Sequence, residues 1–190
     1  MPTVRPNPVD VARTAADIMR AITTDPEYPR LLETCRRYDQ DRTCLTGTLT
    51  ISEWDIADDA GPLINEALRA LALKSAIFRL TGDEHTAEIP IARPVDEVLH
   101  AVLAQRTLTE RMAARHGITF VHMTDTEVAA DGYEPGDYTT ACYAKAYGAE
   151  PPGRYWLSAD EHARRVAILD DRFAQVGVRD LGHRHAFTFN

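Results

Sequence analysis

The sequence predicts a mainly α, single-domain helical bundle with at most a small β element. Apolar residues recur at helical spacing over several long segments, some of which begin at a proline and end just before a glycine. No internal repeat or low-complexity linker divides the 190 residues, and the hydrophobic content of 44% is ordinary for a globular protein. We therefore expect one domain that spans residues 1–190.

Three helices are predicted in the first half of the chain. Residues 8–23 and residues 62–80 each begin at a proline, which suits the first turn of a helix. Residues 29–37 form a shorter predicted helix. The helix over 62–80 ends just before a glycine, and its apolar residues recur at helical spacing: Leu63, Ile64, Ala67, Leu68, Leu71, Ile77 and Phe78.

Three more helices are predicted in the second half. Residues 94–115 are expected to form one helix, which begins at a proline and ends before Gly117. Residues 137–147 precede a glycine in the same way. Residues 158–176 begin Ser-Ala-Asp-Glu, the pattern of a capping box, in which the serine and glutamate satisfy free N–H groups of the first turn.

Extended structure is predicted in few places. Residues 44–51 alternate threonines with apolar residues and glycine, a period of two that indicates a strand. Residues 118–123 are short and fit either a strand or a linker, and residues 181–190 alternate only weakly. The β element is therefore expected at residues 44–51.

The charge of the chain excludes some classes of partner. The formal net charge is -8, whereas proteins that bind nucleic acid by neutralising phosphates need a basic surface. The same charge disfavours docking on anionic membranes, and no apolar run approaches the roughly 20 residues of a membrane span. We expect a small molecule or a protein as partner, with no nucleic acid and no membrane.

The cysteines and the N-terminal residues indicate a cytoplasmic location. Cys35, Cys44 and Cys142 cannot all pair within one chain, and none belongs to a CxxC motif. Reduced thiols are therefore expected, with Cys142 as a buried structural thiol. The first eight residues lack the apolar stretch of a signal peptide.

The helix predicted over residues 94–115 carries one narrow polar strip on an otherwise apolar surface. Asp96 and His100 in this strip are four residues apart, so their side chains can meet. The carboxylate could orient the imidazole and raise its basicity, which makes the two a candidate catalytic pair. The alternative is a solvent-facing pair that contributes little. The strip consists of Arg93, Asp96, His100, Thr107 and Arg111.

Four short segments resemble the glycine-rich domain-containing protein-like family. Residues 93–100 (R-P-V-D-E-V-L-H) and residues 117–122 (G-I-T-F-V-H) are similar to its V-D-E-V-W-H helix and its F-x-H-H segment. Residues 70–76 resemble the helix that precedes them in the family. Residues 140–156 resemble its T-x-x-x-Y-x-x-x-F-G-x-x-P-P-x-x-x-W ending.

The resemblance implies a family-like helical core over residues 62–157. Leu99 stands where the family usually has tryptophan, and Met123 stands where the second histidine of its pair would be. The resemblance implies no particular activity. The 10 glycines are scattered through the chain, so RNA-related ideas attached to glycine-rich segments of plant members do not extend to it.

A metal site is the chemical hypothesis that these residues support. Zinc and non-haem iron are often held by two histidines and one carboxylate with open positions. His100 and His122 are the candidate imidazole ligands. Asp96, Asp125 or His85 could supply the third ligand, and His85 lies in a predicted loop just before the polar helix.

Two classes of function follow from this hypothesis. The first is a small metal-binding protein or metal-dependent enzyme that acts on a small molecule. The second is a non-catalytic protein–protein interaction or regulatory module, in which the acidic residues and His100 only organise the junction between helix and strand. An enzyme needs a concave site where the polar strip meets His122, whereas an interaction module needs an exposed apolar patch.

Overall fold

The fold of the chain is mainly α, as the sequence predicts. A computed structural model describes residues 4–38, 56–123, 132–179 and 184–185. Within these residues the chain forms eight helices and one pair of two-residue strands. Among the described helices, none combines the length and the apolar character that crossing a bilayer requires.

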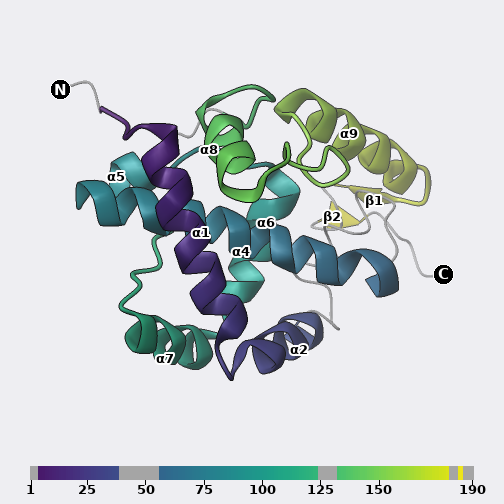
Figure 1. The fold of residues 1–190 in the computed structure, drawn as a ribbon. Coiled ribbons are helices and arrows are strands. Elements are labelled where there is room, and N and C mark those ends of the chain that lie inside the picture. The colour runs from purple at the N-terminus through teal and green to yellow at the C-terminus, as the bar shows by residue number, and fades with distance from the viewer. Residues whose placement is uncertain (1–3, 39–55, 124–131, 180–183, 186–190) are drawn as a thin grey trace.

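Helix α4 (Ile56–Thr81) runs through the centre of the molecule and is buried on nearly all sides (Figure 1). Helix α1 (Pro8–Thr24) crosses one side of it, and α6 (Arg93–Leu103) packs on it as well. The apolar residues of α1 at helical spacing form its buried face: Val11, Ala12, Ala15, Ile18 and Ile22. The predicted helix over 8–23 is therefore confirmed, and α4 supplies more of the core than any other element.

The remaining helices surround this central pair. Helix α2 (Tyr28–Tyr38) contacts α4 and α6, and α8 (Tyr138–Tyr147) packs against α1. Helix α9 (Ala159–Gln175) begins with the predicted cap, since Ser158 Oγ accepts a hydrogen bond from the Glu161 backbone N–H at 3.3 Å. These three helices match the segments predicted at 29–37, 137–147 and 158–176.

Strand pairing in the described residues lies near the C-terminus. Strands β1 (Val178–Arg179) and β2 (Arg184–His185) pair antiparallel. The strand predicted at residues 44–51 lies outside the described residues. The segment over residues 118–123 forms no strand and is a linker.

The predicted start of the central helix is wrong. The sequence places it at Pro62, whereas α4 begins at Ile56 and contains this proline in its interior. A proline inside a helix removes one backbone hydrogen bond. The helix continues through the exposed Pro62, and Leu63 and Ile64 directly after it are fully buried in the core.

The single helix predicted over residues 94–115 is also wrong, because the chain forms two helices there. Helix α6 (Arg93–Leu103) and helix α7 (Arg106–His116) are separated by Ala104 and Gln105. Gln105 has a ψ of 44°, outside the helical range, and this one residue redirects the chain. Neither residue is a glycine or a proline, so no breaker marks the site.

A short helix also replaces a predicted loop. Helix α5 (Glu84–Ala87) follows Asp83, whose carboxylate accepts hydrogen bonds from the backbone N–H groups of His85 and Thr86 at 3.3 and 3.1 Å. Beyond α5 the chain passes the buried Ile89 and enters α6. This path brings Glu88 close to His122.

Candidate metal centre

Asp96 and His100 are held by α6, whose buried face fixes the direction of its polar side. Pro94 occupies the first turn, where a missing N–H costs nothing. The apolar side of the helix is fully buried through Val95, Val98, Leu99, Ala101 and Val102. Asp96 and His100 therefore lie one turn apart on the same side, as the spacing predicts.

His122 reaches this site from the linker that follows α7. The helix ends at Gly117, whose φ of 59° lies in the left-handed region that glycine adopts at low cost. Ile118 and Val121 then bury their side chains in the core. The next side chain, His122, points toward α6, and only 10% of it is exposed.

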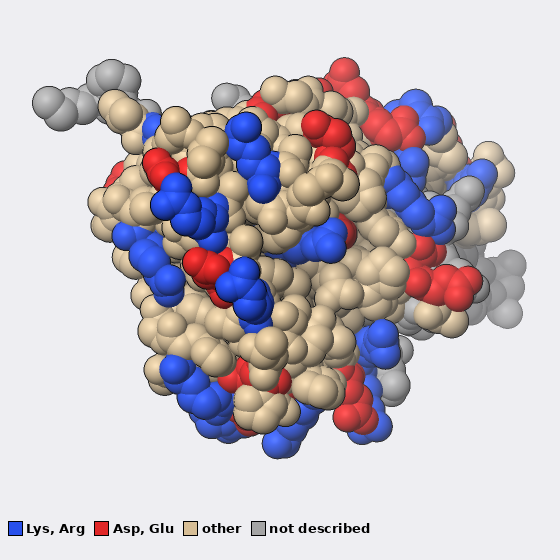
Figure 2. Space-filling view, in the orientation of Figure 1, with Lys and Arg blue, Asp and Glu red and all other residues tan. Residues whose placement is uncertain are grey.

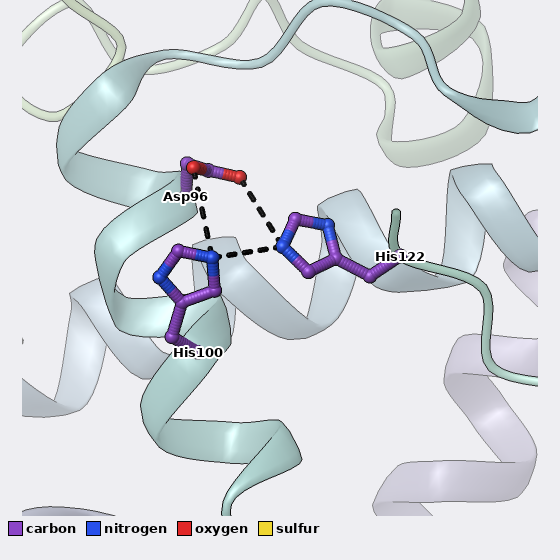
Figure 3. Close-up of side chains that lie close together, drawn as sticks. All are labelled: Asp96, His100 and His122. Carbon is purple, nitrogen blue, oxygen red and sulfur yellow. Dashed lines mark hydrogen bonds and ion pairs between the residues drawn. The ribbon is translucent and has the colours of Figure 1, made fainter. Parts of the chain in front are cut away.

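The three side chains converge on one point (Figure 3). Nε2 of His100 lies 2.9 Å from Nε2 of His122. Oδ2 of Asp96 lies 3.9 Å from Nε2 of His100, and Oδ1 lies 3.9 Å from Nε2 of His122. One potential ligand atom from each residue therefore lies within 4.8 Å of the other two.

These separations suit a small divalent ion. With metal–nitrogen bonds of about 2.1 Å, two nitrogens are about 3.0 Å apart at the right angle of an octahedral ion and about 3.4 Å apart at the tetrahedral angle that zinc prefers. The His100–His122 separation of 2.9 Å matches the octahedral value, so zinc would require the two rings to move apart by about 0.5 Å. The carboxylate would have to move inward by roughly 1 Å, which a rotation of the Asp96 side chain supplies. Two histidines and one carboxylate form the ligand set of zinc enzymes and of non-haem iron(II) enzymes.

The burial of the site is uneven. The side chains of Asp96 and His122 are each 10% exposed, whereas that of His100 is 38% exposed. Solvent thus reaches the cluster on the His100 side. Burial raises the pKa of Asp96, and the nearby His100, Lys74 and Arg93 oppose that rise. A cation bound here would stabilise the ionised carboxylate further.

A buried ion pair lies on the Nδ1 side of the His122 ring. Lys74 of α4 is 2% exposed and pairs with Glu88, whose side chain is 7% exposed. Lys74 Nζ lies 3.1 Å from Nδ1 of His122. An ammonium group can only donate, so Nδ1 accepts, and a neutral His122 then carries its proton on Nε2. That proton points at Nε2 of His100.

Metal binding at Nε2 of His122 requires the other tautomer. The proton must then lie on Nδ1, where it needs an acceptor. Oε1 of Glu88 lies 3.9 Å from this nitrogen and also accepts the backbone N–H of Met123. The Lys74–Glu88 pair as it lies serves the Nε2–H tautomer, and the metal-binding tautomer requires Lys74 to move off Nδ1 and the Glu88 carboxylate to approach it.

The structure brings together three of the five residues considered as ligands. Asp96, His100 and His122 converge as expected. His85 is exposed on α5 and does not belong to this cluster. Asp125 lies outside the described residues. The predicted polar strip is interrupted by the break after α6, because Arg111 moves to α7 and pairs with Glu27.

Sequence reasoning missed Lys74 and Glu88, and it considered Glu97 only as part of the junction in the non-catalytic alternative. A signal for Lys74 was present, because it is the one charged residue between Arg69 and Arg79 of the central helix. Such a lysine needs a buried partner. Nothing in the sequence pairs it with Glu88, which lies 14 residues further along and in another element.

The downstream part of the family-like pattern builds the core and not the metal site. Glu66 is 5% exposed, and its Oε2 accepts hydrogen bonds from Tyr143 Oη at 2.7 Å and from Trp156 Nε1 at 2.8 Å. Arg69 donates to the other oxygen of Glu66 at 2.8 Å. Cys142 is a buried free thiol, and burial raises its pKa to about 11, in agreement with a structural role.

Comparison with known proteins identifies no relative. No family model, no curated protein and no solved structure matches the chain.

The described surface shows no basic region on the face drawn in Figure 2. Acidic and basic side chains are interspersed over the face drawn in Figure 2, and the described residues of this face form no continuous basic patch.

Proposed function

We propose that Asp96, His100 and His122 bind one divalent metal ion, zinc or iron(II), and that the chain is a small metal-dependent enzyme acting on a small molecule. The observation that carries the proposal is the 2.9 Å separation between the two Nε2 atoms, with the Asp96 carboxylate 3.9 Å from both. Three ligand atoms from different turns and segments are aimed at one point.

The number of ligands favours a catalytic over a structural centre. Structural zinc sites are closed by four protein ligands, whereas catalytic sites keep a position for water or substrate. Only three ligand groups converge within the described part of the chain. The exposed His100 side leaves room for a small molecule to approach the remaining positions.

We also propose that the chain belongs to the glycine-rich domain-containing protein-like family. The two histidine-bearing segments of the resemblance, residues 93–100 and 117–122, supply all three proposed ligands. A cytoplasmic location and the absence of nucleic-acid binding are part of the same proposal. The buried free thiols of Cys35 and Cys142 and the net charge of -8 support them.

Metal analysis of the untagged protein tests this proposal. We expect about one zinc or iron(II) ion per chain after reconstitution and removal of loose metal, and loss of this ion in His100→Ala, His122→Ala and Asp96→Asn. His85→Ala is the matched control, since it removes an exposed histidine outside the cluster. Metal content that ignores all three ligand substitutions would overturn the proposal.

A non-catalytic module is the second candidate, and one contact favours it. Lys74 already satisfies Nδ1 of His122 at 3.1 Å, so the histidine pair is hydrogen-bonded without any ion. In that case the cluster only joins α6 to the linker. Added metal would then leave the melting temperature unchanged, whereas a metal bound only to the folded chain raises it.

A further inference from the structure

Glu97 lies next to the proposed ligands but is not one of them. A role for it rests on the proposed metal site and adds a residue to that site. Glu97 is the neighbour of Asp96 on α6, and its side chain is 34% exposed. Its two carboxylate oxygens face two different groups, which is the first observation that needs an explanation.

One oxygen of Glu97 faces the far side of the His100 ring. Oε2 lies 3.7 Å from Nδ1 of His100, while Oε1 lies 3.4 Å from Nε of Arg93. Nε2 of the same ring points in the opposite sense, toward His122 and Asp96. His100 therefore lies between a carboxylate outside the cluster and the point where the ligand atoms converge.

This order is the one that metal-binding histidines require. A ring that binds metal through Nε2 keeps its proton on Nδ1, and a carboxylate at that proton fixes the tautomer, orients the ring and strengthens the ligand. The 3.7 Å separation is longer than a hydrogen bond. A small rotation of the half-exposed Glu97 side chain closes it, and one bridging water molecule would serve as well.

His122 has a related arrangement, which supports a role for the carboxylate beside His100. Oε1 of Glu88 lies 3.9 Å from Nδ1 of His122. Both rings thus direct Nε2 at the cluster and have a glutamate near Nδ1, although Lys74 Nζ lies closer to Nδ1 of His122, at 3.1 Å. Glu88 is buried and paired with Lys74, so its substitution would disturb folding. Glu97 is partly exposed, so it can be substituted without leaving a buried charge unpaired.

We propose that Glu97 is a positioning residue for His100, holding its Nδ1 proton so that Nε2 is available to the metal ion. Glu97 acts through His100 and does not bind the metal itself. Arg93 holds the other oxygen of Glu97 and so keeps the carboxylate beside the ring.

Cobalt(II) titration of the full-length protein tests this role. We expect Glu97→Ala to weaken cobalt affinity by roughly 10- to 100-fold, with a changed visible absorption spectrum of the bound ion. Glu97→Gln should recover much of the affinity, because the amide oxygen still accepts from Nδ1. The melting temperature of the metal-free protein should stay near that of the parent in both variants.

Glu110→Ala is the matched control. Glu110 lies on α7 and pairs with Arg106 four residues away, as Glu97 pairs with Arg93, so both changes remove one negative charge and one helix ion pair. Equal loss in both alanine variants, or none in Glu97→Ala, overturns the positioning role while leaving the metal site intact. If the parent protein itself binds no cobalt, the proposed function fails and this inference fails with it.

Discussion

Nζ of Lys74 lies 3.1 Å from Nδ1 of His122, and the same ammonium group is ion-paired with Glu88. The Lys74 ammonium group on the central helix thus contacts His122, the linker residue whose side chain reaches α6. Both members of the ion pair are almost completely buried. The pair connects the stability of the core to the geometry of the candidate site.

Removing one member of this pair should be costly. In Lys74→Met we expect the free energy of unfolding to fall by about 3–5 kcal/mol, because Glu88 is left as an uncompensated buried charge. Urea denaturation measures the effect. Lys74→Met combined with Glu88→Gln should recover part of the loss, since the glutamine oxygen can still accept from the Met123 backbone. A single variant as stable as the parent would refute the assignment.

Metal affinity should fall as the pH is lowered, because an imidazole must be neutral to bind a metal ion. Protons and the metal ion compete for Nε2 of His100 and His122, so each protonated ring weakens binding about tenfold per pH unit. Competition with a chromophoric chelator at each pH measures the trend. His85→Ala should give the same profile, whereas an affinity that is flat with pH would argue against imidazole ligands.

Acid stability should depend on Asp25, which is buried between α1 and α2. The Arg115 guanidinium holds the pKa of Asp25 at about 2, below its ordinary 3.8. Because the folded-state pKa is the lower one, the stabilisation is complete above pH 3.8 and is lost as the pH falls toward 2. Over that range Asp25→Asn should lose less stability than the parent.

Urea unfolding at several pH values checks this behaviour. Asp10→Asn is the control, since Asp10 pairs with Arg13 in an exposed ion pair on α1. This variant should follow the parent curve. If Asp25→Asn also follows it, the buried carboxylate contributes nothing to acid sensitivity.

The hydroxyl group of Tyr143 should matter more than that of Tyr28. Tyr143 donates to the buried Glu66 carboxylate at 2.7 Å, whereas Tyr28 donates to the neutral Oδ1 of Asn65, also at 2.7 Å. Tyr143→Phe should cost about 1.5–3 kcal/mol and Tyr28→Phe about 0.5–1.5 kcal/mol of unfolding free energy. The reverse order in chemical denaturation would contradict a charged Glu66.

Local patterns predict most of this fold. Helical spacing and caps locate α1, α2, α8 and α9 closely, because local sequence signals mark where these helices begin and end. Two features depend on tertiary packing. Pro62 remains inside α4, where the residues that follow it pack in the core, and α6 ends at Ala104 without any breaker residue.

The candidate site divides in the same way. The Asp96–His100 pair follows from one turn of one helix, so its spacing in the sequence predicts it. The position of His122 next to His100 depends on the left-handed turn at Gly117 and on where α7 lies. Only the family resemblance indicated that the two histidines belong together. Lys74 and Glu88 act through contacts between elements, which no spacing in the sequence encodes, whereas Glu97 lies on the same helix as Arg93 and His100, at spacings of four and three.

The break after α6 has a consequence for local opening. Asp96 and His122 flank α7, so an ion bound to both would tie together the two ends of the segment that contains this helix. Closing a loop removes open states from its ensemble. Backbone amides of α7 would then exchange their hydrogens more slowly in the loaded protein, although none of its residues belongs to the ligand cluster.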